Sequence, residues 1–432
     1  LIYKHTVMKK KKNKFYNILV GFGLSGLGFI ENFKKPIKIY EKNSTSGGHC
    51  KSTSYRGYYF DEGAHISHTK NIFFKKKFFK KNKLIKIDNP NVVNFKNNKV
   101  IGYPVNLSLS SLSLLEKFNV LFDYLRLIFF KKKINNFEDW CRINFGETLY
   151  KNYFKKYTLK YWRTHPQKLS HLNWAKKRIV SGNYFKSLMS IFLNFQNKNM
   201  AYATFYYPKK FGFYNFFEEK FSEYKINKNS EVTKIFPNQK KIIIKKKEIY
   251  YKKIFSTIPL PEYLSLFNKI PPNIKKEIKN LKYTSTICIN FVVKKRMNID
   301  YHWCYFYDNH IEASRMTIIS NIVKNDKKDY QGQIEIFRRN DEKYLVDDLI
   351  KNSKKMIINF FKLENEKDIK ILFHKIYKYS YPVPLRSNKI NIIHKWLNSK
   401  KIYPFGLYGN WKYMWSDESY MNGKLNAQKY SK

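Results

Sequence analysis

Cysteine is scarce in this chain of 432 residues, which contains only Cys50, Cys141, Cys288 and Cys304. The four are scattered, and no two are spaced as a CxxC pair. This spacing argues against a disulfide framework and against a cysteine-based zinc site, and it is typical of proteins from a reducing compartment. We therefore expect no metal site and no thiol redox centre.

Long apolar stretches are also absent. No run approaches the ~18 residues that a helix needs to cross a bilayer. The N-terminus, residues 1–14, is basic but lacks the apolar stretch of a signal peptide. Met8 stands just before a run of lysines like a natural start, so we interpret the first seven residues as an upstream reading of the gene. Together these features predict a soluble, cytoplasmic protein.

Acidic residues are few, because 32 Asp and Glu stand against 84 Lys and Arg, for a formal net charge of +52. Lysine supplies nearly all of the excess, and the abundance of Asn, Ile, Phe and Tyr indicates a drift toward A/T-rich codons. A nucleic-acid surface more often uses arginine, which pairs bidentately with phosphate and guanine. The chain also lacks zinc-finger, RNA-binding and basic heptad patterns. Specific nucleic-acid binding is therefore disfavoured, and only a non-specific attraction to polyanions is expected.

The length is sufficient for a large core, and the apolar fraction of 43% is ordinary for a globular protein. The first pattern is a βαβ unit, with strands at 15–20 and 37–40 around a helix at 24–33. The remaining patterns predict helices at 72–84, 110–133, 137–161, about 389–397 and from about 417, short strands within 231–257, and strands of a second sheet at 284–293, 303–307, 316–322 and 333–337.

Three glycines connect the first strand to the first helix, and Glu41 follows 20 positions after the first of them. Gly21 permits the tight turn, Gly23 lets the backbone approach a pyrophosphate, and Gly26 lets the helix pack closely on the strand. The helix N-terminus offers free N–H groups to phosphates. Glu41 can accept hydrogen bonds from the ribose of an adenosine without a 2′-phosphate. The pattern predicts dinucleotide binding, and the alternative is a glycine-rich turn of an unrelated α/β protein.

Two stretches after Glu41 extend this pattern. Residues 46–52 read Ser-Gly-Gly-His-Cys-Lys-Ser, and residues 60–65 read Phe-Asp-Glu-Gly-Ala-His. The combination resembles the FAD-binding amine-oxidase-like superfamily, which includes protoporphyrinogen oxidase-like and UDP-galactopyranose mutase-like flavoproteins. In that family the double glycine, here Gly47 and Gly48, follows the ribose acid, and the second stretch lies beside the flavin.

The resemblance covers most of the chain. Further segments similar to the family occur at residues 137–146, 157–169, 207–212, 255–259 and 406–423. The resemblance implies an α/β fold, with a Rossmann-like FAD-binding domain and an interleaved substrate domain of helices and a mixed sheet. The expected FAD-binding domain comprises residues 1–70, 200–260 and 375–432, and the expected substrate domain comprises residues 71–199 and 261–374.

The resemblance also implies FAD as the cofactor and assigns residues to it. The expected cofactor-binding residues are Gly21, Gly23, Ser25, Gly26, Glu41, Gly47, Gly48, Val232 on the adenine side, Gly406 and Asp417. The last helix, beginning near Asp417, is expected to direct its N-terminus toward the flavin–pyrophosphate region.

Three residues are candidates for the chemistry. His65 is expected beside the flavin ring, and its alternative is a histidine that hydrogen-bonds in a buried turn. Arg315 resembles a family arginine that clamps phosphate or carboxylate on the substrate side, and its alternative is a surface ion pair. Trp162 is expected to stack on a substrate or flavin edge, and its alternative is core packing.

Two reactions remain open. The main prediction is an oxidoreductase that passes a hydride from a C–N or C–C bond to the flavin, with a sugar or cell-envelope precursor as candidate substrate. The alternative is a redox-neutral sugar mutase, toward which residues 63–69 and 157–162 lean. Against the mutase, Leu407 stands where an arginine is expected, and a second arginine is missing from residues 178–182. Both arginines would hold a nucleotide diphosphate.

The expected partner is a small molecule, with a nucleotide sugar or glycan precursor as the candidate. A basic scaffold that binds no flavin is a third reading, which the intact glycines disfavour. The Phe/Lys alternation at residues 72–84 is interpreted as a solvated helix. The alternative is that this helix makes a weak contact with an anionic membrane.

Overall fold

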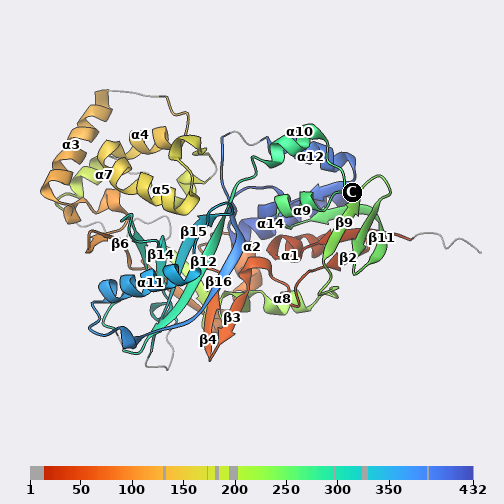
Figure 1. The fold of residues 1–432 in the computed structure, drawn as a ribbon, viewed down its shortest axis with the longest axis horizontal. Helices are drawn as coiled ribbons and strands as arrows, with labels where there is room; N and C mark the ends of the chain where they lie inside the picture. Colours follow the sequence, from red (N-terminus) through yellow and green to blue (C-terminus); the bar gives the residue numbers. More distant parts are fainter. Residues whose placement is uncertain are drawn as a thin grey trace, which may run out of the picture.

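The computed structural model describes residues 14–129, 133–172, 174–180, 184–193, 203–295, 297–323, 329–386 and 389–431. The interpreted start at Met8, the residues before it, and residues 181–182 of the segment that lacks the second arginine lie outside the described residues. Two main β-sheets lie side by side along the long axis of the molecule (Figure 1).

The first sheet carries the N-terminal βαβ unit. Its strands run in the order β2 (Ile37–Tyr40), β1 (Phe15–Val20), β11 (Lys247–Ser256), β10 (Lys241–Ile244) and β9 (Val232–Phe236), and β17 (Ile402–Pro404) also pairs with β11. The strands β2, β1, β11 and β17 are parallel, whereas β10 is antiparallel to both neighbours. Parallel strands need cover on both faces, which explains the fully apolar run from Ile18 to Val20.

Helices cover the two faces of this sheet. On one face, α1 (Leu24–Ile30) and α14 (Ser416–Ser431) pack together, so that segments from the two ends of the chain share one core (Figure 1). On the other face lie α9 (Leu260–Ser265), α10 (Pro272–Ile278) and α12 (Ile390–Ser399). The closing segment of the chain thus returns to the first glycine turn.

The second sheet has seven strands. Their order is β16 (Ile369–Pro382), β12 (Tyr283–Val293), β15 (Tyr330–Arg339), β14 (Arg315–Ile318), β13 (Trp303–Phe306), β6 (Val92–Lys96) and β7 (Lys99–Gly102). Neighbouring strands are antiparallel, apart from the parallel pair β13 and β6. The helix α11 (Val346–Phe361) buries its apolar stripe against one face of this sheet.

Side-chain alternation gives the second sheet two different faces. Because successive residues of a strand point to opposite sides, Cys304, Met316 and Ile334 pack under α11. The residues next to them in the strands turn the other way and line a cavity; they include Trp303, Tyr305, Arg315, Thr317, Gln333 and Glu335. The sheet therefore presents polar and aromatic side chains to the interior of the molecule.

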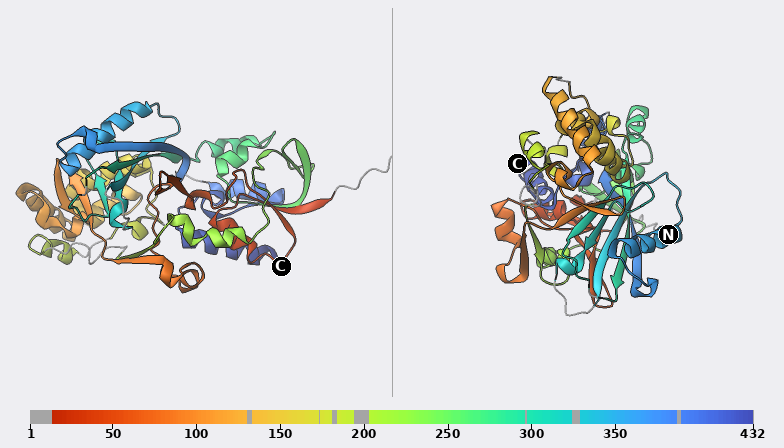
Figure 2. Two further views of the ribbon diagram at one scale, coloured as in Figure 1. Left: turned by 90° about the horizontal axis from the view of Figure 1, so that it is seen from below. Right: turned by 90° about the vertical axis from the view of Figure 1, so that its left-hand side faces the viewer.

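Helices form a layer over the second sheet on its cavity side (Figures 1 and 2). They are α3 (Leu114–Phe129), α4 (Phe137–Leu149), the π-helical turn η5 (Tyr150–Phe154), α5 (Lys155–Trp162), α6 (Ala175–Arg178) and α7 (Tyr184–Met189). The remaining helices and strands are α2 (Ile72–Phe78), α8 (Glu218–Ser222), α13 (Gly406–Gly409), the hairpin β3 (Ser52–Tyr55) and β4 (Tyr58–Asp61), and the pair β5 (Leu84–Asp88) and β8 (Thr204–Pro208).

The predicted α/β fold with a Rossmann-like unit and mixed sheets is confirmed, and the first two strands have the predicted bounds. The predicted helix at 72–84 is wrong beyond Phe78. The residues from Leu84 onward form β5, because pairing with β8 overrides the Phe/Lys periodicity that continues past the helix end.

Two other elements differ from their predictions. The predicted helix at 137–161 is interrupted, because Gly146 has a left-handed φ of 80° and a π-helical turn follows before α5. The predicted strand at 316–322 ends at Ile318, where the chain turns into a short 3₁₀ helix. The two-domain division stays a prediction. If domains follow the hydrophobic cores, α9 and α10 belong with the first sheet.

Within the described residues, no helix is long and apolar enough to cross a membrane. Over the same ranges, no three His, Cys, Asp or Glu side chains gather as metal ligands would. All four cysteines are buried and unpaired.

Candidate active site

A cavity of about 780 Å³ is lined by residues from both sheets. One part of its wall is formed by the glycine turn after β1, the end of β2, the start of β9 and the N-terminal turn of α14. The other part is formed by the inner face of the second sheet and by α5. Eight of the ten predicted cofactor residues line this cavity. The other two, Gly26 and Gly406, lie just outside its surface.

Two of the three motif glycines are required by the protein's own packing. Gly21 has a φ of +85°, and a Cβ there would lie 2.7 Å from both the Ile258 methyl and the Thr257 hydroxyl. A Cβ on Gly26 would lie 2.9 Å from the Gly21 carbonyl oxygen, so the helix could not approach the turn as closely. These glycines fix the strand–turn–helix geometry itself.

Gly23 is different, because nothing in the protein requires a glycine there. Its φ of −91° is open to any residue, and the nearest atom to an added Cβ would be the Gly48 Cα at 3.6 Å, an ordinary contact. Gly23 pairs with Gly47, whose N–H donates to the Phe22 carbonyl at 2.8 Å. The absent side chain leaves free cavity space in front of this backbone. That space fits a pyrophosphate held by main-chain groups.

Glu41 is buried at the end of β2 and holds the glycine turn. Its Oε2 accepts a hydrogen bond from the Phe22 N–H at 3.0 Å, and its Oε1 accepts from the Asn43 N–H at 2.9 Å. The carboxylate is thereby fixed at the cavity edge, with Val232 at the start of β9 also in the lining. This arrangement fits the adenosine end of a dinucleotide, with the carboxylate toward the ribose.

The closing segment meets the first helix at Ser25. Gly406 has a φ of +76°, and a Cβ there would lie 2.7 Å from the Ser25 Cβ. Its N–H donates to the Asn422 side chain at 2.8 Å, which ties this turn to α14. In the first turn of α14, Asp417 lines the cavity and accepts hydrogen bonds from the Thr69 hydroxyl and from the Glu418 N–H. The N-terminal turns of two helices therefore meet at one cavity.

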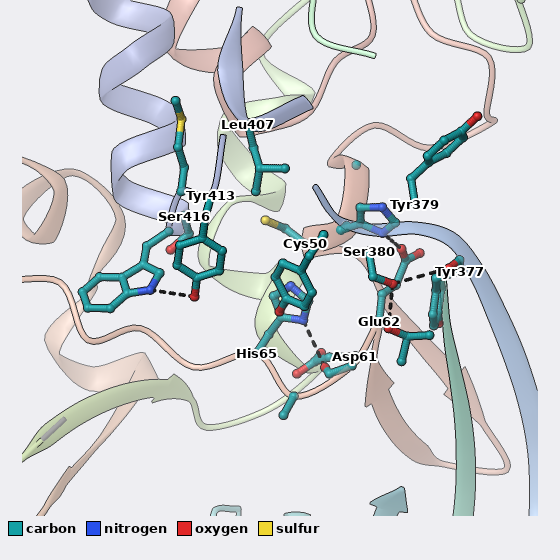
Figure 3. Close-up of a pocket in the computed structure, with 18 of the residues that line it drawn as sticks. Cys50, Asp61, Glu62, His65, Tyr377, Tyr379, Ser380, Leu407, Tyr413 and Ser416 are labelled. Carbon is teal, nitrogen blue, oxygen red and sulfur yellow. Dashed lines mark hydrogen bonds and ion pairs between the residues drawn. The ribbon is translucent and has the colours of Figure 1, made fainter. Parts of the chain in front are cut away.

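His65 lines the cavity and follows a turn that requires a glycine. Its Nδ1 lies 3.0 Å from the Gly63 carbonyl oxygen, which can only accept, so Nδ1 carries the proton. Gly63 has a φ of +91°, and a Cβ there would lie 2.7 Å from Glu335. In the view of Figure 3, the imidazole lies between Tyr413 on one side and Glu62 on the other. The ring is thus held by its own turn while facing the cavity.

Arg315 lies in the cavity wall with little of its side chain exposed, so the alternative of a surface ion pair is wrong. Its side chain is 12% exposed, and its Nε donates to the Glu335 carboxylate. Glu335 also accepts from the Ala64 N–H at 3.2 Å, so the pair is tied to the His65 turn. Arg315 lines the cavity beside this pair, where a guanidinium can bind an anionic group of a ligand.

Trp162 is 1% exposed and packs against the rings of Tyr161 and Trp174, with centroids 4.9 and 5.2 Å away. Its predicted role at a substrate or flavin edge stays a prediction. Residues 157–162 were recognised from the sequence as similar to the family, but Tyr157 and Tyr161 within them were not singled out. They lie one turn apart on α5, and their buried hydroxyls have no hydrogen-bond partner in the described structure. Both tyrosines also line the cavity, where a ligand could satisfy these hydroxyls.

A second cluster that the sequence analysis missed surrounds Glu62. The His49 Nδ1 lies 2.7 Å from its Oε2, and the amino groups of Lys51 and Lys375 lie 4.0 and 3.9 Å from its Oε1. Burial alone would raise the pKa of Glu62, but the hydrogen bond with His49 and the nearby charges of Lys51 and Lys375 outweigh it and the pKa is lowered. His49 follows the double glycine directly, a position that could have singled it out in the sequence.

His68, three residues after His65, makes a pH-dependent contribution to stability. Burial, with a smaller effect of the Arg315 charge, lowers the pKa of His68 from 6.5 to about 4. The folded protein therefore keeps this imidazole neutral where the unfolded chain protonates it. Its contribution is complete above pH 6.5 and is lost as the pH falls toward 4. The shift corresponds to about 3 kcal/mol.

We expect His68→Gln to remove this part of the acid sensitivity. The free energy of unfolding is measured by urea titration at several pH values. Between about pH 7 and pH 4 it should fall less steeply for the variant than for the wild type. Replacement of His310, which is exposed and outside the cavity lining, serves as the control. Parallel pH profiles of wild type and His68→Gln would contradict the expectation.

Comparisons with known proteins agree with this architecture. Residues 19–79 match the model of the NAD(P)-binding Rossmann-like domain. No curated protein sequence matches the chain. Among solved structures, a reduced UDP-galactopyranose mutase has a TM-score of 0.86 at 20% identity, and the match covers 96% of this chain and 95% of the other.

Two further structures are similar over their whole length. A protein from Exiguobacterium sp. 255-15 that carries the provisional name protoporphyrinogen oxidase has a TM-score of 0.72 at 13% identity, covering 97% of this chain and 99% of the other. A CLA-producing fatty acid isomerase from P. acnes has a TM-score of 0.63 at 13% identity, covering 96% and 99%. The first two names are those of the branches that the sequence resembles, so the predicted likeness is confirmed as a likeness of fold.

Proposed function

We propose that this chain is a FAD-dependent enzyme that acts on an anionic small molecule, and that it is an oxidoreductase. One observation supports the proposal: a single cavity is lined in one part by the glycine turn and Glu41, and in another by Arg315 and the unpartnered hydroxyls of two tyrosines. A cofactor and a substrate would thus share one water-poor space.

The cofactor half is supported by the glycine turn. Gly23 leaves open space that the protein itself does not need, and Glu41 stands fixed at the adenosine end. The double glycine and the first turn of α14 would complete the cradle around the rest of the dinucleotide. When bound, FAD would supply a ring that accepts and returns a hydride.

The substrate half is supported by charge and by aromatic rings. The Arg178 guanidinium lies 4.5 Å from the Tyr161 ring centroid and 5.2 Å from that of Tyr413. Burial raises the pKa of Tyr157, and the charges of Arg178 and Arg315 both oppose that rise, which places both cations near this hydroxyl. Two cations and several aromatic rings around one cavity suit a substrate that has both a phosphate or carboxylate group and a planar or apolar part.

A redox-neutral mutase is the second candidate function. The buried position of Arg315 inside the cavity favours it, together with the high structural similarity to the mutase. Leu407 lies in the cavity lining beside the Ser25–Gly406 contact, where the mutase branch would have an arginine. It still argues against the mode of substrate binding expected for that branch. The class of flavin-dependent oxidoreductase therefore remains the main proposal.

Two measurements test the proposal. The purified protein should show flavin absorbance and release FAD on denaturation, and a colourless protein that FAD does not reconstitute would refute it. The dithionite-reduced protein should then be incubated with UDP-galactopyranose. Conversion of this sugar nucleotide without net oxidation of the flavin would establish the mutase. No conversion, together with loss of the absorbance of the oxidised flavin when a substrate is added to the oxidised protein, would support the oxidoreductase.

We expect His65→Ala to change the absorbance maxima of the bound flavin and to lower turnover, because the imidazole would contact the ring and fix its surroundings. The matched control is His310→Ala, an exposed histidine outside the cavity. An unaltered flavin spectrum and unaltered turnover in His65→Ala would show that this histidine only stabilises its own turn.

A further inference from the structure

The helix α3 carries an apolar face that the rest of the described structure does not cover. Seven Leu, Phe and Ile side chains of this helix are between 37% and 73% exposed. They are Leu114, Leu115, Phe118, Leu121, Phe122, Leu125 and Ile128. At 100° per residue, they form a continuous arc of roughly 140° around the helix. So large an exposed apolar patch marks a contact surface.

The same helix buries a second stripe against the protein. Val120 and Tyr124 are fully buried, and the Tyr124 ring lies 5.2 Å from that of Tyr184 on α7. The inner stripe therefore accounts for the packing of α3 in the fold. The outer arc is additional, and folding of the described residues does not explain it.

Charges are arranged around this arc in a consistent way. Both acids of α3 face the protein: Glu116 pairs with Lys96 at 2.7 Å, and Asp123 accepts from the Thr148 N–H at 2.6 Å. On the helical wheel, Lys117 borders one edge of the arc and Arg126 borders the other. The arc is thus apolar in the middle, basic at both edges and free of acidic side chains.

The neighbouring segment extends the surface. Phe185, Phe192 and Leu193, in and just after α7, are 71%, 83% and 48% exposed. The views of Figures 1 and 2 both place α3 and α7 at the same end of the molecule. We name the exposed side chains of α3 and these three residues the end surface.

We propose that the end surface docks on an anionic lipid bilayer, with α3 lying in the plane of the interface. A helix with long apolar side chains in the middle and cations at its edges matches an interfacial helix, whose apolar face enters the acyl boundary while its cations meet the headgroups. A second copy of this chain is disfavoured by charge, because two molecules of formal charge +52 would bring their basic edges together. This inference is independent of the cofactor.

The alternative membrane contact at residues 72–84 is much smaller. Only Ile72 and Phe73 of α2 are exposed apolar residues, at 69% and 45%, and the Lys424 amino group lies 4.0 Å over the Phe73 ring. The pair Ile72→Ser and Phe73→Ser therefore makes a matched control for the end surface.

Flotation of the full chain with vesicles tests the proposal. Vesicles of phosphatidylcholine and phosphatidylserine in equal parts should bind the wild type, and pure phosphatidylcholine should bind it far less. The double variant Phe118→Ser with Phe122→Ser should lower the partition coefficient by about tenfold or more, because two exposed rings no longer enter the lipid. The α2 control pair should bind like the wild type.

A second measurement does not depend on removing side chains. Leu125→Cys, labelled with a polarity-sensitive dye while the native cysteines stay buried, should shift its emission to the blue on anionic vesicles. No binding to anionic vesicles, an equal loss in the α2 control pair, or an unshifted dye would overturn the proposal. A different pattern would also overturn it. In that pattern, light scattering shows that the wild type is a dimer and that the double variant Phe118→Ser with Phe122→Ser is a monomer, while the wild type does not bind vesicles.

Discussion

Gly23→Val is expected to weaken FAD binding severely while the apoprotein stays folded. The valine side chain would occupy the cavity space in front of the glycine turn, where the pyrophosphate would approach the backbone. We expect the dissociation constant for FAD to rise at least about a hundredfold, equivalent to about 2.7 kcal/mol. Calorimetric titration of the apoprotein with FAD measures this change directly.

The smaller change Gly23→Ala separates binding from folding. With a φ of −91° and only ordinary contacts for a Cβ, alanine fits the apoprotein, and it reduces the entropy of the unfolded chain. The apoprotein should therefore be as stable as the wild type or more stable by about 0.5 kcal/mol, yet bind FAD less tightly. Gly21→Ala is the contrasting control, because its φ of +85° and its 2.7 Å contacts make that substitution destabilising. Unchanged FAD affinity in Gly23→Val would remove the basis of the proposed function.

The cofactor half of the site could be predicted from the sequence because its signals are local. The positions of Gly21, Gly26 and Glu41 follow from one strand–turn–helix unit, although Gly21 also packs against Thr257 and Ile258, which follow the distant strand β11. Gly406 and Asp417 are far from this unit in the sequence, and they were predicted from the family resemblance. The contact of Gly406 with Ser25 depends on long-range packing, in which α14 lies on α1.

The substrate half could be predicted only in part, because it includes alternating residues of three strands, β13, β14 and β15. Arg315 and Glu335 form a pair although 20 positions separate them, and this pairing depends on the register between β14 and β15. Once the register is known, the alternation is informative. Gln331, Gln333 and Glu335 alternate along a central strand that is buried from Tyr330 to Arg338, and such buried polar residues are the signal for a polar interior face.

The tyrosines of α5 were missed for a compositional reason. Tyr and Phe are so frequent in this chain, at 35 and 36 residues, that a single aromatic residue carries little information. Tyr157 and Tyr161 are distinguished by their unpartnered hydroxyls, a property that exists only after packing. The errors at 72–84 and 316–322 have a similar origin, because strand pairing and a 3₁₀ turn ended elements whose periodicity continued.

Gly423→Ala is expected to lower the free energy of unfolding by about 3 kcal/mol or more, because it separates the first and last helices. A Cβ on Gly423 would lie 2.8 Å from the Phe29 backbone nitrogen and closer still to the Ser25 carbonyl oxygen. Backbone atoms cannot rotate away as a side chain can, so the helices would have to move apart. Urea unfolding measures the loss, and Leu425→Ala, at a 59% exposed position of the same helix, should change it by less than about 0.5 kcal/mol.

The crossing is reciprocal, which gives the prediction a second test. A Cβ on Gly28 would lie 2.9 Å from the Tyr420 carbonyl carbon, so each helix has a glycine where the other's backbone arrives. Either alanine forces the same separation, and the double variant Gly28→Ala with Gly423→Ala should therefore cost less than the sum of the two. Because Ser25 and Asp417 stand at the cavity ends of these helices, FAD affinity should fall in parallel with stability. Additive losses would mean that each glycine serves its own helix rather than their shared contact.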